Sequence, residues 1–266
     1  MSDAAVQGLV EYARDGAVVT LTLNRPEKLN AFDDAMVMAL DEGLRRFDAD
    51  GEALIAIIAG RGRAFSTGAD VQQRQLRSRA EFERLGGPQG HGANSGDLFV
   101  KAVNWKPVIA AVHGYVLGLA VGITFESDLV VAEAGTRFQI TEVSRGLGGA
   151  QYWGLLNFCG AAAFATEMAL TGRFFTAEEA HAAGLINRLA PTGEHLAAAR
   201  ALAEEVLKNP PLSVRATVRA RRWQMSRLLQ EIKMQTAPLK LYLTEDFQEA
   251  ARAFAEKRPP RPFKGR

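Results

Sequence analysis

The sequence contains only one cysteine, Cys159, so no disulfide bond can form within the chain. A chain without a disulfide framework is typical of a reducing compartment, and we expect a cytoplasmic protein. Cys159 follows the apolar stretch Leu155-Leu156-Asn157-Phe158, which favours a buried small side chain over a nucleophile. Histidine is also scarce, and His91, His181 and His195 lack the spacing of metal ligands, so we predict no metal site.

The sequence also lacks an excess of charge and any long apolar run. Its 32 Lys and Arg residues nearly balance its 30 Asp and Glu residues, for a formal net charge of +2, and the two signs are interspersed. This pattern argues against a nucleic-acid partner. No apolar run is long enough to span a membrane, and the N-terminal residues, with Asp3 and Glu11, do not have the pattern of a secretion signal. We therefore expect neither a nucleic-acid nor a membrane partner.

What is present is an alternation of strand and helix patterns that predicts an α/β fold within 266 residues. Residues 6–12 and 17–23 flank an Asp-Gly turn and predict a hairpin. A helical stripe at residues 33–50 precedes a buried strand at 54–59. From residue 194 the chain is predicted to be helical to about residue 258, with a break at Pro210-Pro211.

The central stretch runs from Lys106 to Asp128. Val108 to Val112 is a short apolar run rich in β-branched residues, which predicts a buried strand. The chain then turns at His113-Gly114 and enters a helix near Gly118. Because the first amides of a helix have no intrahelical acceptor, they point into the space in front of the helix and favour an anionic oxygen. Glycines that merely permit close helix packing are the competing interpretation.

A second glycine-flanked turn strengthens the first interpretation. Residues 62–70, Gly-Arg-Ala-Phe-Ser-Thr-Gly-Ala-Asp, also follow an apolar strand and can direct the amide of Ala69 into the same cavity. Two amides that converge on one carbonyl oxygen form an oxyanion hole.

Six segments extend in order over nearly the whole chain: Asn24 to Ala31, Ala64 to Asp70, Pro107 to Gly118, Leu170 to Gly172, Ala183 to Ile186 and Phe254 to Arg258. Taken together, these segments resemble the enoyl-CoA hydratase/isomerase (crotonase) superfamily. The resemblance implies a crotonase-like spiral of repeated ββα units in residues 1–190 and a C-terminal helical trimerisation and lid region in residues 191–266. It further implies an acyl-CoA thioester as partner, a homotrimer or a dimer of trimers, and no cofactor beyond the CoA moiety.

The resemblance also implies site residues. The amides of Ala69 and Leu119 would hold the thioester oxygen; the family usually has glycine where Leu119 stands, so its side chain must point away from the thioester. The substrate and CoA contacts implied by motif position are Lys28, Ala31, Ser66, Gly68, Asp70, Gly118, Gly122, Lys257 and Phe263. For Lys28, a solvated loop charge is an equally good interpretation. The segment at residues 86–96, rich in glycine, is predicted to be a mobile loop. The resemblance implies that it borders the acyl end of the pocket, and a plain surface insertion is an equally good interpretation.

The carboxylates depart from the hydratase pattern. Hydratases of this family use two glutamates, and the first of the two positions is occupied here by Gly122, whereas the second is Glu142. One carboxylate suffices to move a proton between C2 and C4 of a 3-enoyl thioester, because it can return the proton it takes. The pattern therefore resembles that of an enoyl-CoA isomerase with a single glutamate.

Glu126 leaves a further possibility open. It lies one helical turn after Gly122, where an apolar residue is expected. It is either a substitute acid or base, which would allow hydration, or a structural carboxylate paired with an arginine or with a subunit neighbour. The motifs are also compatible with a hydrolase or C–C bond enzyme on the same fold, and with a non-catalytic acyl-CoA-binding protein.

Overall fold

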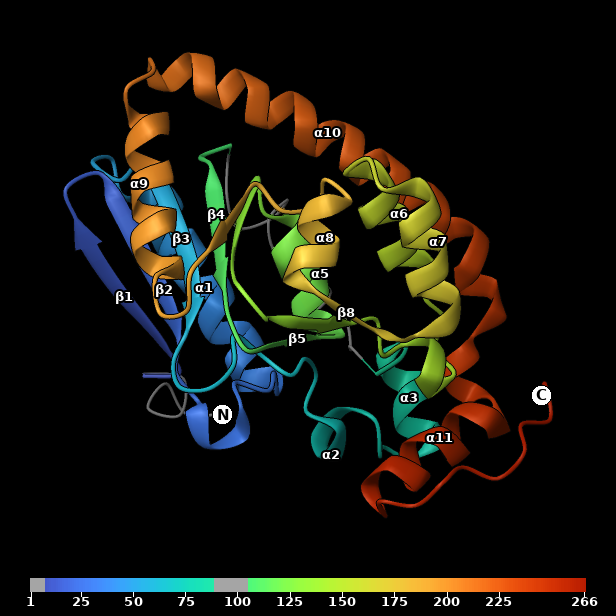
Figure 1. The fold of residues 1–266 in the computed structure, drawn as a ribbon. Coiled ribbons are helices and arrows are strands. Elements are labelled where there is room, and N and C mark those ends of the chain that lie inside the picture. The colour runs from blue at the N-terminus through green and yellow to red at the C-terminus, as the bar shows by residue number, and fades with distance from the viewer. Residues whose placement is uncertain (1–7, 89–104) are drawn as a thin grey trace.

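The computed structural model describes residues 8–88 and 105–266. Most of the predicted loop at residues 86–96, together with His91, lies outside these ranges. The described residues form two sheets and the helices around them (Figure 1). No described helix is both long and apolar enough to cross a membrane.

The larger sheet has six strands in the order β1-β2-β3-β4-β6-β9. Only β1 and β2 pair antiparallel; each following neighbour is parallel, so the chain crosses over between strands. A smaller sheet has the order β5-β7-β8. The strands are β1 Val10–Asp15, β2 Val18–Leu23, β3 Ile55–Gly60, β4 Val108–Val112, β5 Tyr115–Leu117, β6 Leu129–Glu133, β7 Arg137–Gln139, β8 Phe174–Thr176 and β9 Arg188–Ala190.

Both faces of the central strands are buried, which explains why their sequences are continuously apolar. Alternate residues of β3, such as Ile57, pack with Leu202 of α9 on one face. Their neighbours, such as Ile58, join the main core with Leu40 of α1 on the other face. The helices are α1 Asp34–Ala49, α2 Val71–Arg74, α3 Arg79–Leu85, α5 Leu119–Glu126, α6 Ala150–Phe158, α7 Ala162–Thr171, α8 Ala177–Ala182, α9 His195–Leu207, α10 Pro211–Thr236 and α11 Glu245–Ala255.

Several local predictions are confirmed. The hairpin is β1 and β2, although β1 begins later than residue 6, and β4 occupies the predicted five residues. Asp33 caps α1 by accepting a hydrogen bond from the Met36 amide. The proline pair separates α9 from α10, because Pro211 fits the first position of a helix but not its interior.

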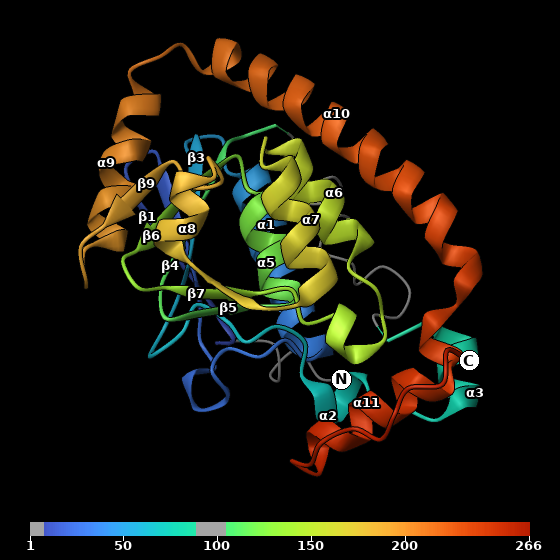
Figure 2. The ribbon, with the colours of Figure 1, turned by 45° about the vertical axis from the view of Figure 1, so that its right-hand side comes forward.

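Helix α10 is the longest described element and arches over the molecule from α9 to the region of α3 and α11 (Figures 1 and 2). Its anchor to the sheet is the buried guanidinium of Arg222. The Arg222 Nε donates to Asp128 Oδ1 at 3.1 Å, and its Nη2 donates to the carbonyl of Lys106 at 3.0 Å. Asp128 also accepts from the amide of Val108 at 2.9 Å, so one carboxylate joins α10 to the start of β4.

Candidate active site

The two glycine-flanked turns that the sequence singles out lie against each other. Ser66 pairs with β5: its amide donates to the carbonyl of Tyr115 at 3.1 Å, and its carbonyl accepts from the amide of Leu117 at 3.1 Å. Gly68 then passes so close that a Cβ would lie 2.3 Å from the Leu117 oxygen and 3.2 Å from the Leu119 nitrogen. Gly68 also has a φ of +82°, so only glycine fits this approach.

The amides of Ala69 and Leu119 therefore come together at the start of α5. Leu119 is the first residue of that helix, after Gly118 with a φ of +51°. Within residues 8–88 and 105–266, neither amide donates a hydrogen bond to a protein acceptor. Both residues line the same cavity. Two amides without acceptors beside a helix N-terminus are available to hold an anionic oxygen.

Glu142 lies directly beside this turn. A Cβ on Gly118 would meet Oε1 of Glu142 at 3.0 Å and Oγ1 of Thr141 at 2.6 Å. The segment that contains Glu142 also holds the turn in place, because the Gly118 amide donates a hydrogen bond to the carbonyl of Gln139 at 2.9 Å. The absence of a side chain at Gly118 thus allows a carboxylate to approach the amide of Leu119.

These groups open onto one cavity of about 750 Å³. Five of its lining residues are predicted from the sequence: Ala69, Leu119, Gly122, Glu126 and Glu142. Other lining residues come from α2, α6, the long helix α10 and the segment that follows it; they include Arg74, Gln75, Leu147, Tyr152, Ser226, Leu229, Lys233 and Tyr242. Apart from the expected C-terminal cover, sequence reasoning missed these residues.

The pKa of Glu142 is raised to about 7, chiefly because the carboxyl is withdrawn from bulk water into the cavity wall. The nearby hydroxyls of Tyr152 and Thr141 act in the opposite direction and lower the pKa of Glu142, and Oγ1 of Thr141 lies 3.5 Å from Oε2 of Glu142. The pKa of Tyr152 itself is raised well above 10, first by burial and then by the charge of Glu142. A carboxyl with a pKa near neutrality is suited to taking up and returning a proton.

Glu126 lines the same cavity from α5 and is only 3 % exposed. It is the last residue of α5, one turn beyond Gly122, whereas the carboxyl of Glu142 lies beside Gly118, which precedes the first residue of that helix. Arg74, also buried, lines the cavity as well, and burial lowers its pKa. This part of the cavity therefore contains both a carboxyl and a guanidinium group.

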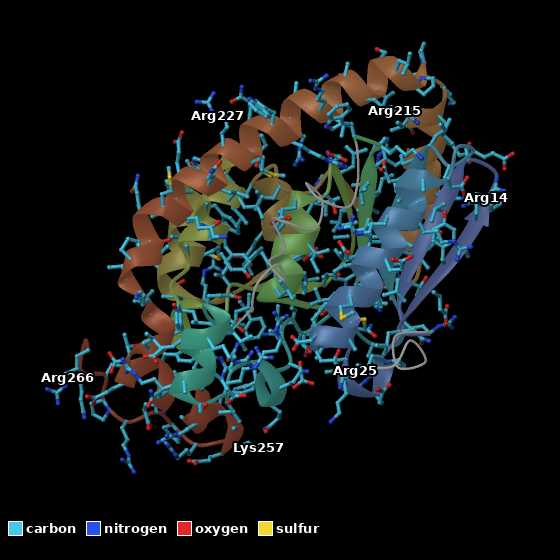
Figure 3. All side chains as sticks on the ribbon, turned by 180° about the vertical axis from the view of Figure 1, so that it is seen from behind. Arg14, Arg25, Arg215, Arg227, Lys257 and Arg266 are labelled. Atoms are coloured by element: carbon cyan, nitrogen blue, oxygen red, sulfur yellow. The ribbon has the colours of Figure 1, made fainter. Side chains whose placement is uncertain are left out.

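The remaining predicted contacts lie outside this cavity wall. Lys28 is exposed in a short 3-10 helix, and the carbonyl of Ala31 accepts from Arg25 at 3.0 Å. The Lys257 side chain is exposed on the C-terminal segment, at the edge of the molecule in Figure 3. Phe263, further along that segment, is 54 % exposed. The proposed CoA contacts of these residues stay predictions.

Ser66 and Asp70 stabilise the first turn itself. The Ser66 hydroxyl donates to the Asn30 carbonyl at 2.7 Å and accepts from the Gly68 amide at 3.0 Å. Asp70 caps α2 and pairs with Arg25 at 3.0 Å. Both side chains thus hold the backbone that presents the Ala69 amide.

The described residues contain no group of three or more His, Cys, Asp or Glu side chains placed to hold a metal ion. The His195 ring is buried and stacks on His113 at 4.6 Å, with its Nδ1 3.0 Å from Oε2 of Glu133. This contact connects the start of α9 to the end of β6, which is a structural role. His181 is likewise engaged locally, with Nδ1 2.9 Å from the Ile186 carbonyl.

Two amides without protein acceptors, a carboxyl with a pKa near 7 and a large cavity form an arrangement that can hold an anionic oxygen and exchange a proton. The family model described as enoyl-CoA hydratase/isomerase matches residues 13–266. The chain is 36% identical over 254 residues to a putative enoyl-CoA hydratase of Thermus thermophilus, covering 92% of this chain and 97% of that protein. It is 34% identical to the 2,3-dehydroadipyl-CoA hydratase of Escherichia coli, covering 96% of this chain and 98% of that protein.

Solved structures agree with these similarities. The crystal structure of a carnitinyl-CoA hydratase from Mycobacterium avium superposes with a TM-score of 0.77 at 31% identity, covering 98% of this chain and all of the other. The chain therefore belongs to the enoyl-CoA hydratase/isomerase family and has the crotonase fold predicted from its motifs.

Proposed function

We propose that this enzyme moves a proton on an acyl-CoA thioester with Glu142 as the acid and base, converting a 3-enoyl thioester to the 2-enoyl isomer. The amides of Ala69 and Leu119 hold the thioester oxygen while negative charge develops on it. Glu142 removes a proton from C2 and returns it to C4 through the dienolate, so the reaction consumes neither water nor a cofactor.

The observation that carries this proposal is the position of Glu142 against the Gly118 turn, in a cavity whose wall has a glycine at position 122. The carboxyl lies beside the amide that would hold the oxygen, so the α-carbon of a bound thioester falls within its reach. Gly122 contributes no second carboxylate at the turn. Isomerisation needs one proton carrier, whereas hydration also needs an oriented water molecule.

The test uses a 3-enoyl-CoA and, separately, a 2-enoyl-CoA in deuterated water, with products identified by mass and chromatography. We expect conversion of the 3-enoyl compound with deuterium incorporation, and a loss of roughly 100- to 10,000-fold in Glu142→Gln. Binding of the thioester without isomerisation or deuterium exchange would instead indicate a non-catalytic acyl-CoA-binding protein. Release of free CoA would indicate a hydrolase.

Hydration is the second candidate, and a specific observation favours it. Glu126 lines the cavity that contains Glu142, and relatives of this chain are named as hydratases. In this scheme Glu126 holds the water that the absent carboxylate at position 122 would otherwise hold. Glu126→Gln should then abolish the gain of water by a 2-enoyl-CoA while leaving isomerisation in place. Equal loss of both reactions in this variant would assign Glu126 to the structure of the cavity instead.

We also propose a homotrimeric or hexameric assembly in the cytoplasm. Helix α10 supports this assembly, because large apolar side chains remain exposed along it, with Leu212 at 76 % and Trp223 at 65 %. Figure 3 shows Arg227, which is exposed, on the outer side of the same helix, so this surface also carries positive charge.

A further inference from the structure

The backbones of the two glycine turns meet at His113, the residue that follows β4. The His113 carbonyl accepts a hydrogen bond from the Phe65 amide at 2.9 Å. The next residue, Gly114, has a φ of +63°, and a Cβ there would lie 2.1 Å from the Arg63 carbonyl oxygen. Because the two backbones are in direct contact here, the path of the first turn depends on the conformation around His113.

The His113 side chain holds the beginning of the same turn. Its Nε2 lies 2.9 Å from the Gly62 carbonyl oxygen, and because a carbonyl can only accept, Nε2 carries the proton. The other ring nitrogen, Nδ1, is buried and has no hydrogen-bond partner within residues 8–88 and 105–266. A second proton on Nδ1 would be buried without an acceptor, so the site favours a neutral ring with its proton on Nε2.

The His195 ring covers one face of the His113 ring. The two rings are stacked with centroids 4.6 Å apart and an angle of 26° between their planes, and the residues are 8 % and 9 % exposed. Nδ1 of His195 donates to Oε2 of Glu133 at 3.0 Å, which fixes the ring at the start of α9. Burial and the neighbouring His113 lower the pKa of His195, against the raising effect of Glu133. The His113 ring therefore cannot turn without displacing the first residue of α9.

We propose that His113 is a positioning residue of the oxyanion site: its ring and its carbonyl hold residues 62–65 so that the amide of Ala69 faces the thioester oxygen. The inference rests on the proposed function of the Ala69 and Leu119 amides. The described wall of the cavity does not include His113, so it acts through the backbone of the turn and not by contact with the substrate.

A positioning role and a purely structural role predict different kinetics. Stabilisation of an oxyanion depends steeply on the direction of the donor, because the negative charge develops only in the transition state. A loosened turn should therefore reduce the rate of proton exchange far more than the affinity for an unreacted thioester. Loss of folded protein would instead reduce the rate and the number of binding sites together.

The experiment compares the wild-type protein with His113→Leu and His113→Gln. Leucine removes the donor to the Gly62 carbonyl, whereas glutamine is long enough to bring an N–H to it. The matched control is His181→Leu, which removes a similar contact on α8, between Nδ1 and the Ile186 carbonyl at 2.9 Å. Infrared difference spectra of bound butyryl-CoA, labelled with ¹³C at the thioester carbonyl, report the polarisation of this carbonyl without requiring turnover. Deuterium exchange at the α-carbon and the dissociation constant are measured at pH 8.

We expect the carbonyl band of butyryl-CoA to move to lower frequency on binding to the wild-type protein. His113→Leu should lose most of this shift and lower the exchange rate by roughly 10- to 100-fold, while the dissociation constant changes by less than about threefold. His113→Gln and His181→Leu should keep the shift. A full band shift in His113→Leu would overturn the inference.

Variants of His195 test the same inference with His113 in place. His195→Phe keeps a flat ring, whereas His195→Ala removes it, so only His195→Ala should weaken the band shift. NMR of ¹⁵N-labelled histidine at pH 7 should place the proton on Nε2 of His113, and a proton on its Nδ1 would overturn the inference. If the wild-type protein shows no band shift, the proposed role of the amides has failed as well. A band shift that depends on His113, without any deuterium exchange, would contradict only proton transfer by Glu142.

Discussion

Glu142 illustrates how one residue can favour chemistry and oppose stability. Burial raises the pKa of Glu142 to about 7, whereas an unfolded chain has the ordinary value near 4.5. Between these two values the folded state binds more protons than the unfolded state, so the free energy of unfolding falls as pH rises through this range.

Replacement of Glu142 by glutamine is therefore expected to stabilise the protein above pH 7. A neutral amide carries no charge to desolvate. The gain is about 1–3 kcal/mol at pH 8 and disappears below pH 4.5, where both proteins are neutral at this position. Denaturant unfolding of the wild-type and variant proteins at pH 4 and pH 8 measures the difference. Equal stability at both pH values would show that the carboxyl is well solvated.

Replacement of Gly118 tests whether the turn beside Glu142 is needed for turnover. Alanine at this position would place a Cβ against Thr141 and Glu142 at a φ of +51°. Gly118→Ala should lower turnover by roughly 100-fold or more, because it displaces both the carboxylate and the Leu119 amide.

The control for Gly118→Ala is Gly135→Ala. Gly135 has a φ of +78°, but no atom lies within 4 Å of the place that a Cβ would take, so alanine meets only backbone strain there. This variant should lose about 1 kcal/mol of stability and keep its activity. Equal turnover in the two variants would contradict the role assigned to the Gly118 turn.

Glu142 and Ala69 could be predicted as site residues because each lies in a motif made of residues that are adjacent in the sequence. The same reasoning does not find Tyr152 or Arg74. Tyr152 has the apolar character expected in any first turn of a buried helix, and its place in the cavity wall depends on where the preceding glycine turn positions α6. Arg74 belongs to a short segment with the polar composition of a surface, yet it is fully buried.

At the scale of elements, prediction depends on length. Strand β4 and helix α1 are long enough to show a hydrophobic pattern, and the structure confirms both. Strands β5, β7, β8 and β9 have three residues each, too few for an alternation to emerge, and they exist because long-range pairing supplies the hydrogen bonds. Helix α9 covers one face of the larger sheet. Some of the residues it packs against belong to β2 and β3, which lie more than a hundred residues earlier in the chain.

The link between α10 and the sheet gives a prediction at this scale. Asp128→Ala removes the carboxylate that faces the buried Arg222, and we expect a loss of about 3–5 kcal/mol in the free energy of unfolding. The double variant Asp128→Ala, Arg222→Met should recover part of this loss, because it also removes the buried charge. Urea unfolding measures both.

An exposed ion pair serves as the comparison. Arg79→Ala breaks the pair with Glu83 on the surface of α3 and should change stability by less than about 1 kcal/mol. A loss in Asp128→Ala no larger than the loss in Arg79→Ala would show that α10 is held by apolar packing alone.

At the scale of the whole molecule, the exposed face of α10 predicts assembly. Trp223→Glu places a charge on this face and should weaken subunit association by about 2–4 kcal/mol. Sedimentation across a range of protein concentrations measures the change. Leu170→Glu alters a side chain that is 72 % exposed on α7 and should leave the association constant in place. Identical sedimentation of both variants and the wild-type protein would remove α10 from the interface.

The two sides of α10 have different surroundings. Ser226, Leu229 and Lys233 line the cavity, whereas Trp223 and Arg227 face outward. One helix therefore belongs both to the wall that would enclose the acyl group and to the surface that would meet a second subunit. If association orders this helix, thermodynamic reciprocity requires that thioester binding strengthens association by the same factor by which association strengthens thioester binding. Dilution would then dissociate the assembly into subunits and also lower the affinity for the thioester.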